Sequence, residues 1–236
     1  MFVFKKKPKI IQAAARKIVT FTNPRSVVSE QFKTIRTNIN FSMPDQKLEA
    51  LMFTSASPNE GKSTVASNVA IVFAQEGKKV LLVDADMRKP TTHYTFKTAN
   101  AHGLTNVLTN QSTWQEVITE TPISGLDILP CGPIPPNPAE LIGSQKMVLL
   151  IEQLKQAYDL IIFDTPPILS VTDAQILSNK CDGAILVINS GTSEKESVQK
   201  AAEALQNSKA NVIGTVLNNY KLAKDHYYYQ YYGNAE

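Results

Sequence analysis

Two observations predict an α/β fold with a mostly parallel sheet and helices on both of its faces. Six short runs are mainly apolar, as strands buried on both faces are. Helix-like stretches separate these runs, which is the order that parallel strands with crossover helices require. The 236 residues are enough to bury a substantial core in one such domain or two small ones.

The first element after a basic stretch is expected to be a helix of about residues 24–41. Asn23-Pro24 resembles a helix start, because proline suits the first helical turn. Val28, Phe32, Ile35 and Ile39 then follow helical spacing. Pro44 and the residue after it end the pattern.

Strands and helices alternate along the rest of the chain. Strands are predicted at Ala50–Thr54, Val80–Asp84, Leu126–Leu129, Leu160–Asp164, Ala184–Asn189 and Val212–Leu217. Helices are predicted at Lys62–Gln75, Trp114–Thr119, Ser144–Tyr158, Thr172–Ser178 and Glu194–Ser208. The proline-rich stretch Gly132–Leu141 is expected to be a stiff loop entering a helix, with Asn137 as N-cap, Pro138 as first residue and Glu140 as capping-box partner.

The composition fits a globular protein, with 43% hydrophobic and 19% charged residues. No run reaches the roughly 18 apolar residues of a membrane helix, and the first residues lack the apolar run of a secretory signal. We therefore expect a cytoplasmic protein. Two distant cysteines, Cys131 and Cys181, and three scattered histidines argue against a disulfide framework and a histidine-built metal site.

The net charge of +3 is unevenly distributed. Residues 1–25 hold seven basic residues and no acidic one, so the remainder has a net charge of −4. The body of the protein is therefore not expected to bind nucleic acid. We predict that residues 1–23 form a basic arm, which is either solvated or in contact with anionic lipid or an acidic partner.

The strongest motif stands between the first predicted strand and the helix that follows it, as a phosphate-binding P-loop requires. Backbone N–H groups there would hold phosphate oxygens, Gly61 permits their close approach, and Lys62 would neutralise the β- and γ-phosphates. Ala56 replaces the first glycine of the usual pattern. The predicted nucleotide-binding residues are Ser57, Pro58, Asn59, Glu60, Gly61, Lys62, Ser63 and Thr64.

Three aspartates follow predicted strands: Asp84 and Asp86 after one, and Asp164 at the end of another. Ligands of parallel sheets bind at the carboxyl ends of strands. We therefore expect the three aspartates and the Ser63 hydroxyl to form a Mg²⁺ site, directly or through water, and Lys62 and the aspartates to be catalytic. Arg88-Lys89-Pro90 either stabilises transferring charge, holds a partner carboxylate, or is a solvated basic loop.

These motifs, with the proline loop and Asp164-Thr165-Pro166-Pro167, resemble those of the bacterial tyrosine kinases of the Gram-positive capsule and exopolysaccharide type. The resemblance covers about residue 25 to the end. It implies a P-loop ATPase fold related to the MinD and ParA ATPases, the use of ATP and Mg²⁺, and regulation of polysaccharide synthesis by tyrosine phosphorylation of protein substrates. It also implies a separate transmembrane adaptor that recruits the kinase to the inner face of the membrane.

Two positions depart from the family pattern. Asn59 stands where a glycine is common, although asparagine tolerates positive φ better than most residues. The oligomer motif Glu-x-x-Arg-x-x-Arg appears as Glu30, Lys33 and Arg36, and lysine forms a poorer fork than arginine. These three residues are predicted to contact a neighbour in a ring-like homo-oligomer. The alternative is a local Glu30–Lys33 pair within the helix.

The kinase domain is predicted at residues 24–222. The C-terminal segment, residues 223–236, differs from it in composition because it is rich in tyrosine. The family resemblance implies phosphorylation in trans at its tyrosine cluster, and a terminus with little to pack against suits entry into a neighbouring site. Phosphates there would repel one another and loosen the ring. The alternative is an aromatic edge that packs on the sheet or on a partner. The predicted phosphorylation sites are Tyr227, Tyr228, Tyr229, Tyr231 and Tyr232.

Two other functions fit parts of the sequence. A MinD/ParA-type ATPase switch without kinase activity shares the P-loop, but its extra lysine near the loop start is replaced by Ser57. A non-catalytic nucleotide-dependent adaptor would not need the lysine and the three acids. Either Asp84 or Asp86 is expected to accept or position the phenol proton, and Asn218 and Asn219 either lie near the adenine or cap a loop.

Overall fold

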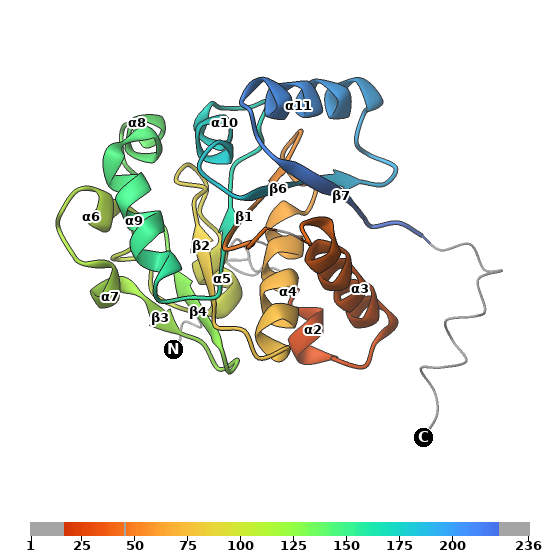
Figure 1. Ribbon diagram of the computed structural model, residues 1–236, viewed down its shortest axis with the longest axis horizontal. Coiled ribbons are helices and arrows are strands. Elements are labelled where there is room, and N and C mark those ends of the chain that lie inside the picture. Colours follow the sequence, from red (N-terminus) through yellow and green to blue (C-terminus); the bar gives the residue numbers. More distant parts are fainter. Residues whose placement is uncertain (1–16, 45, 222–236) are drawn as a thin grey trace, which may run out of the picture.

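The computed structural model describes residues 17–44 and 46–221, where a seven-stranded sheet separates two layers of helices (Figure 1). The strand order is β3-β4-β2-β5-β1-β6-β7. Neighbouring strands run parallel, except that β3 pairs antiparallel with β4. The predicted fold class is confirmed. The strands are β1 Ala50–Ser55, β2 Val80–Asp84, β3 Thr119–Glu120, β4 Leu126–Leu129, β5 Leu160–Asp164, β6 Gly183–Asn189 and β7 Val212–Asn218.

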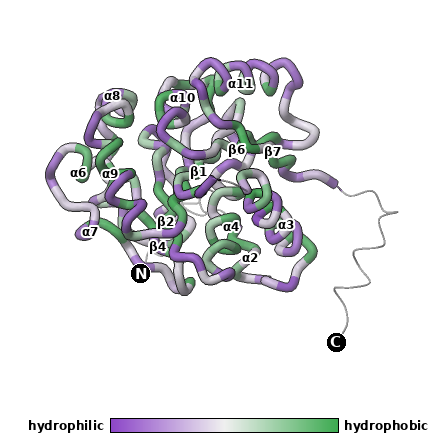
Figure 2. The backbone as a smooth tube through the Cα atoms, in the orientation of Figure 1, coloured by the Kyte–Doolittle hydropathy of each residue, from purple (hydrophilic) through white to green (hydrophobic). Residues whose placement is uncertain are grey.

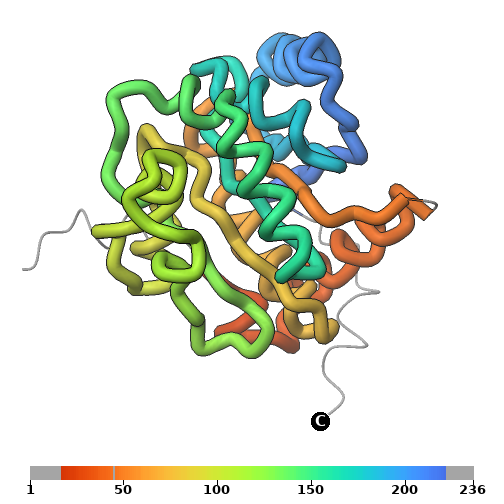
Figure 3. The backbone as a smooth tube through the Cα atoms, turned by 60° about the vertical axis from the view of Figure 1, so that its left-hand side comes forward, coloured from red at the N-terminus to blue at the C-terminus, as the bar shows by residue number. Residues whose placement is uncertain are grey.

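The helices divide between the two faces of the sheet. Figures 1 and 3 show α8 and α9 on one side and α2, α3 and α4 on the other. The helices are α2 Val19–Thr22, α3 Val27–Ser42, α4 Lys62–Gln75, α5 Thr92–Phe96, α6 Leu104–Leu108, α7 Trp114–Val117, α8 Pro138–Gly143, α9 Gln145–Lys155, α10 Asp173–Ser178 and α11 Lys195–Asn207. No helix of the described residues is long and apolar enough to cross a lipid bilayer.

Each central strand contributes side chains to two separate hydrophobic cores. Leu51 and Phe53 of β1 pack in the core beneath α3 and α4, whereas Met52 packs in the core beneath α8 to α11. This alternation follows from the two-residue period of a strand, and it explains why these strands are apolar throughout. Figure 2 accordingly shows a hydrophobic β2 in the interior and hydrophilic turns on the outside of α11.

The N-terminal helix begins later than the sequence suggested. Ser26 is the N-cap of α3, and its Oγ accepts a hydrogen bond from the Ser29 N–H at 3.2 Å. Pro24 lies in the turn before it. The predicted start at Asn23-Pro24 was wrong, because the Ser26 side chain caps the N-terminal end of the helix by accepting the Ser29 N–H.

The predicted arm of residues 1–23 is not loosely held throughout. Residues 17–23 include α2, whose Thr20 is buried against α4. Residues 1–16, the basic part of the arm, lie outside the described residues.

The proline-rich loop enters α8 at Pro138, as predicted. Asn137 occupies the N-cap position, but its side chain makes no capping hydrogen bond. Its Nδ2 instead donates to Glu140 Oε2 at 2.5 Å, so the predicted capping box is replaced by a contact between the two side chains.

Candidate active site

The P-loop connects the end of β1 to the first residue of α4, at the carboxyl edge of the sheet. Asn59 has a φ of 66° and Gly61 a φ of 95°, so two residues of the loop adopt left-handed backbone. A Cβ added at Gly61 would lie 1.9 Å from Asn218 Nδ2, which itself donates to the Glu60 carbonyl at 3.0 Å. Glycine is therefore required at 61 for both conformation and space.

A buried carboxylate holds the outer side of this loop. Glu60 Oε2 accepts a hydrogen bond from the Ser57 N–H at 2.9 Å, and its Oε1 accepts one from Ser193 Oγ. The Asn189 N–H donates to the same Ser193 Oγ at 2.8 Å. The P-loop is thereby fixed to the segment between β6 and α11. Nothing in the sequence pointed to Ser193, because the contact joins residues that are distant along the chain.

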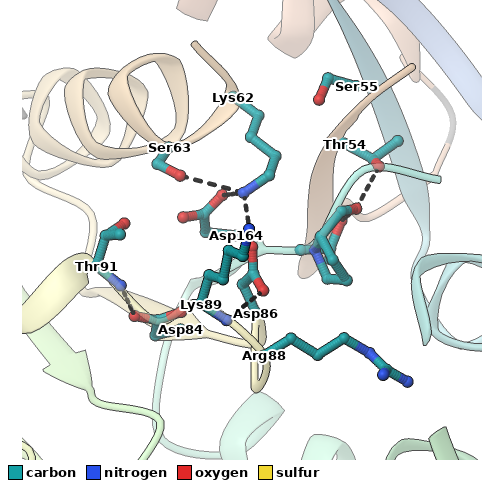
Figure 4. A network of polar contacts seen from close by, with 12 residues as sticks. Thr54, Ser55, Lys62, Ser63, Asp84, Asp86, Arg88, Lys89, Thr91 and Asp164 are labelled. Atoms are coloured by element: carbon teal, nitrogen blue, oxygen red, sulfur yellow. Dashed lines mark hydrogen bonds and ion pairs between the residues drawn. The ribbon is translucent and has the colours of Figure 1, made fainter. Parts of the chain in front are cut away.

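Lys62 lies between two of the predicted aspartates (Figure 4). Its Nζ is 3.1 Å from Asp86 Oδ2 and 3.5 Å from Asp164 Oδ1, and it donates to Ser63 Oγ at 3.3 Å. Burial alone would lower the pKa of Lys62, but Asp164 and Asp86 outweigh burial and the pKa is raised. The ammonium group is therefore charged and positioned at the loop.

Asp84 stands beside Asp164, since the two residues are partners in the β2–β5 register. One oxygen of Asp84, Oδ2, accepts the backbone N–H groups of Thr91 and Thr92, both at 2.9 Å. The other oxygen, Oδ1, is buried and has no hydrogen-bond partner among the described residues. Burial, with Asp164 as the next cause, raises the pKa of Asp84 to about 7. This carboxyl group can therefore exchange a proton near neutral pH.

The oxygen atoms around Lys62 could supply some of the ligands of a hard divalent cation. Within residues 17–44 and 46–221, no three His, Cys, Asp or Glu side chains come close enough together to hold a metal ion by themselves. Mg²⁺ usually keeps several waters and takes one or two carboxylates plus substrate phosphates. Ser63, Asp86 and Asp164 lie around the same ammonium group, and Asp84 adds an unpartnered oxygen, so the donor set fits Mg²⁺ held together with a nucleotide.

The basic residues after β2 have separate roles in the structure. Arg88 forms a two-pronged contact with the buried carboxylate of Asp173, at 2.9 and 3.0 Å, and in Figure 4 it extends away from Lys62. The Lys89 N–H donates to Asp86 Oδ1 at 3.0 Å. Of the alternatives for this segment, Arg88 therefore takes the carboxylate contact, and its partner is in the same chain.

The two cysteines provide no nucleophile. Burial raises the pKa of Cys131 to about 12, with Asp84 as a further cause. Burial also raises the pKa of Cys181. Both thiols stay protonated at neutral pH, which agrees with their expected structural role.

A pocket of 370 Å³ is lined in part by Lys62 and Ser63. Asn218 and Asn219, at the end of β7, line it together with the P-loop. Asn218 Nδ2 donates to the Glu60 carbonyl of the loop, whereas Asn219 Nδ2 donates to Asn189 Oδ1 at the end of β6. The full lining is Lys17, Asn59, Gly61, Lys62, Ser63, Thr64, Asn218 and Asn219.

The predicted oligomer residues make contacts within the chain. Lys33 Nζ is 2.7 Å from Glu30 Oε1, the local pair given above as an alternative. Arg36 donates to the Val72 carbonyl at 3.1 Å and lies 3.4 Å from Glu76 Oε1, so it ties α3 to α4. The five predicted phosphorylation sites, Tyr227, Tyr228, Tyr229, Tyr231 and Tyr232, lie outside the described residues.

Comparisons with known proteins agree with this geometry. Residues 59–218 match the model of a family described as an AAA domain. The tyrosine-protein kinase YwqD of Bacillus subtilis is 52% identical over 221 residues, which span 94% of this chain and 93% of that protein.

Solved structures extend the likeness. The chimerical protein CapA2B2 superposes with a TM-score of 0.84 at 43% identity, covering 88% of this chain and 93% of that one. The septum site-determining protein MinD of Pyrococcus horikoshii, solved with Mg-ADP, superposes with a TM-score of 0.63 at 26% identity, covering 75% and 72%. Both agree with a P-loop fold.

Proposed function

This chain belongs to the bacterial tyrosine kinases and is itself a tyrosine-protein kinase, and from that premise we propose that it phosphorylates its own C-terminal tyrosines with Mg-ATP. The acceptors are Tyr227, Tyr228, Tyr229, Tyr231 and Tyr232 of a neighbouring copy. The proposal further includes control of capsular or exopolysaccharide synthesis through this modification. A transmembrane adaptor would activate the kinase at the inner face of the membrane.

One observation carries the proposal: a charged lysine stands at the start of the P-loop helix between Asp86 and Asp164, 3.1 and 3.5 Å from their oxygens. With a nucleotide present, Lys62 would turn from these carboxylates to the β- and γ-phosphates, and the N–H groups at the start of α4 would hold the phosphate oxygens. Mg²⁺, when bound, would offset charge on the same phosphates. Ser63, Asp86 and Asp164 are the residues that would hold it.

The reaction requires little covalent chemistry from the protein. The phenol oxygen of a tyrosine forms a bond to the γ-phosphorus while the bond from that phosphorus to the β–γ bridging oxygen breaks, releasing ADP. The phenol has a pKa near 10 and must lose its proton in the process. Lys62 stabilises the charge that moves to the leaving oxygen.

Asp84 is the better of the two candidate bases. Its pKa of about 7 lies near neutral pH, and its Oδ1 has no hydrogen-bond partner among the described residues. Asp86 Oδ1 accepts the Lys89 N–H, and Asp86 Oδ2, which now contacts Lys62, would become free for Mg²⁺ once Lys62 turns to the phosphates. We therefore assign proton acceptance to Asp84, and the metal side of the site to Asp86 and Asp164.

Two measurements test the proposal in order. Calorimetry of the purified full chain with ATP should show binding that depends on Mg²⁺, and mass spectrometry after incubation with Mg-ATP should find phosphate on residues 227–232. Lys62→Met should lose the phosphate. Hydrolysis of ATP with unmodified tyrosines, in the presence of the membrane adaptor as well as without it, would instead indicate a switch ATPase.

A further inference from the structure

Lys17 lines the pocket beside the P-loop although it belongs to the N-terminal segment, far from the loop in sequence. It is an exposed residue just before α2. The pocket walls opposite it come from the loop and the start of α4, and from Asn218 and Asn219. A second cationic side chain therefore stands beside the loop that binds phosphate, in addition to Lys62.

A buried amide holds Lys17 in this place. Asn68, which is fully buried on α4, donates through Nδ2 to the carbonyls of Lys17 at 2.8 Å and of Thr64 at 2.9 Å. Its Oδ1 accepts from both the N–H and the hydroxyl of Thr20, at 3.0 and 2.9 Å. Asn68 thus uses both ends of its side chain to join the segment before α2 to the first turn of the P-loop helix.

Further buried hydrogen bonds support the contacts that Asn68 makes. Thr20 is 1% exposed and its carbonyl accepts a further hydrogen bond from Gln75 Nε2 at 3.0 Å. Buried amide groups that satisfy several partners at once define a single backbone position. The main chain of Lys17 is therefore fixed beside Thr64, while its side chain remains accessible to a ligand.

The location selects the part of the nucleotide that Lys17 would meet. Lys62 and the aspartates occupy the end of the site where the γ-phosphoryl group transfers. Lys17 is fixed next to Thr64, on the pocket that lies between the loop and the two asparagines after β7. A nucleotide whose terminal phosphates lay at Lys62 would extend into this pocket, and its inner phosphate would then pass Lys17.

We propose that Lys17 is a nucleotide-binding residue that contacts the inner phosphate of ATP and ADP. This inference rests on the proposed nucleotide site and adds to it a cation from outside the P-loop. An exposed lysine–phosphate contact is worth a modest amount, because water and salt screen it. The loss on its removal should be about threefold to tenfold in affinity.

The test is calorimetric titration of the full chain with Mg-ATP, Mg-ADP and adenosine at low salt. Lys17→Met should weaken the binding of ATP and of ADP equally, by about threefold to tenfold, and leave adenosine binding unchanged. In high salt, the difference in affinity between Lys17→Met and the wild type should largely disappear. Lys17→Arg should retain the wild-type affinity for both nucleotides. Lys146→Met, which removes an exposed lysine on α9, is the matched control and should bind as the wild type does.

The titrations distinguish an error in the role of Lys17 from an error in the proposed nucleotide site. If the wild type binds neither nucleotide, the proposed nucleotide site is wrong as a whole. If the wild type binds both and Lys17→Met binds them equally well, only the role of Lys17 is overturned. Weaker adenosine binding in Lys17→Met would also overturn it, since a phosphate contact cannot affect a ligand without phosphate.

Discussion

At the scale of single residues, Asn59 shows how the loop tolerates a departure from the family pattern. Its φ of 66° lies in the left-handed region, where asparagine is several times more frequent than most residues other than glycine. The glycine that the loop cannot replace is Gly61, because Asn218 fills the space where its Cβ would be. The P-loop therefore needs one true glycine and one residue that accepts positive φ.

A prediction at this scale concerns the charge state of Asp84. Its pKa is raised to about 7, whereas the unfolded chain has a value near 4, so the folded protein binds the extra proton between these values. The contribution of Asp84 to stability is therefore greatest at low pH, and it is lost as the pH rises from about 4 through about 7. Asp84→Asn, which resembles the protonated carboxyl group, should be more stable than the wild type, by a margin that grows on the order of 2 kcal/mol from pH 5 to pH 8.

Urea unfolding in metal-free buffer at the two pH values measures this margin. Glu203→Gln, an exposed change on α11, serves as the control and should show the same small difference at both. A margin for Asp84→Asn that stays constant or shrinks toward pH 8 would contradict the raised pKa.

At the scale of elements, prediction from sequence succeeded where a segment is buried on both sides. The bounds of β2, β4, β5 and α4 agree with the prediction at both ends, because mainly apolar segments between turn residues leave few alternatives. The short helices α5 and α6 were not predicted. Their positions depend on contacts from elsewhere, such as the Asp84 carboxylate that receives the N–H groups where α5 starts.

The same distinction applies to the site. Lys62 was predicted because a P-loop places a lysine where its helix starts, and the aspartates were predicted because they follow strands. The structure brings Lys62, Asp86 and Asp164 together. Ser193, Asn68 and Thr20 carry no such signal. Their roles arise only when distant segments meet, so a single sequence could not reveal them.

The element-scale prediction concerns the contact between the P-loop and the segment before α11. Ser193→Ala removes the hydroxyl that joins Glu60 to the Asn189 N–H, leaving a buried carboxylate oxygen without that donor. We expect the free energy of unfolding to fall by about 1–3 kcal/mol. Ser197→Ala, one turn further into α11, should change it by less than about 0.5 kcal/mol. Urea unfolding of both variants provides the comparison. Equal effects would show that the contact between Ser193 and Glu60 does not stabilise the fold.

At the scale of the whole molecule, α3 connects the fold to its proposed assembly. One side of α3 packs in the core with Phe32 and Ile39, and Arg36 ties it to α4. The other side carries the Glu30–Lys33 pair, whose side chains are 56% and 38% exposed. The helix thus presents charged groups outward without depending on them for its own position.

The last prediction follows from this division. An exposed pair of this spacing stabilises a helix by only about 0.2–0.5 kcal/mol, so Glu30→Ala should leave urea unfolding almost unchanged. If Glu30 contacts a neighbouring copy, as its place in the oligomer motif predicts, the same variant should reduce the mass measured by light scattering across a range of protein concentrations.

Arg36→Ala and Glu152→Ala provide the two comparisons. Arg36→Ala should lower the stability, because it removes the hydrogen bond to the Val72 carbonyl and the ion pair with Glu76. It should also lower the mass, because Arg36 belongs to the same predicted oligomer motif as Glu30. Glu152→Ala, an exposed change on α9, should alter neither. The predicted contact would be contradicted if the mass of Glu30→Ala were unchanged, or if the wild type stayed monomeric at every concentration. In either case the exposed charges of α3 would not bind a neighbouring copy, and the helix would contribute only to the fold of its own chain.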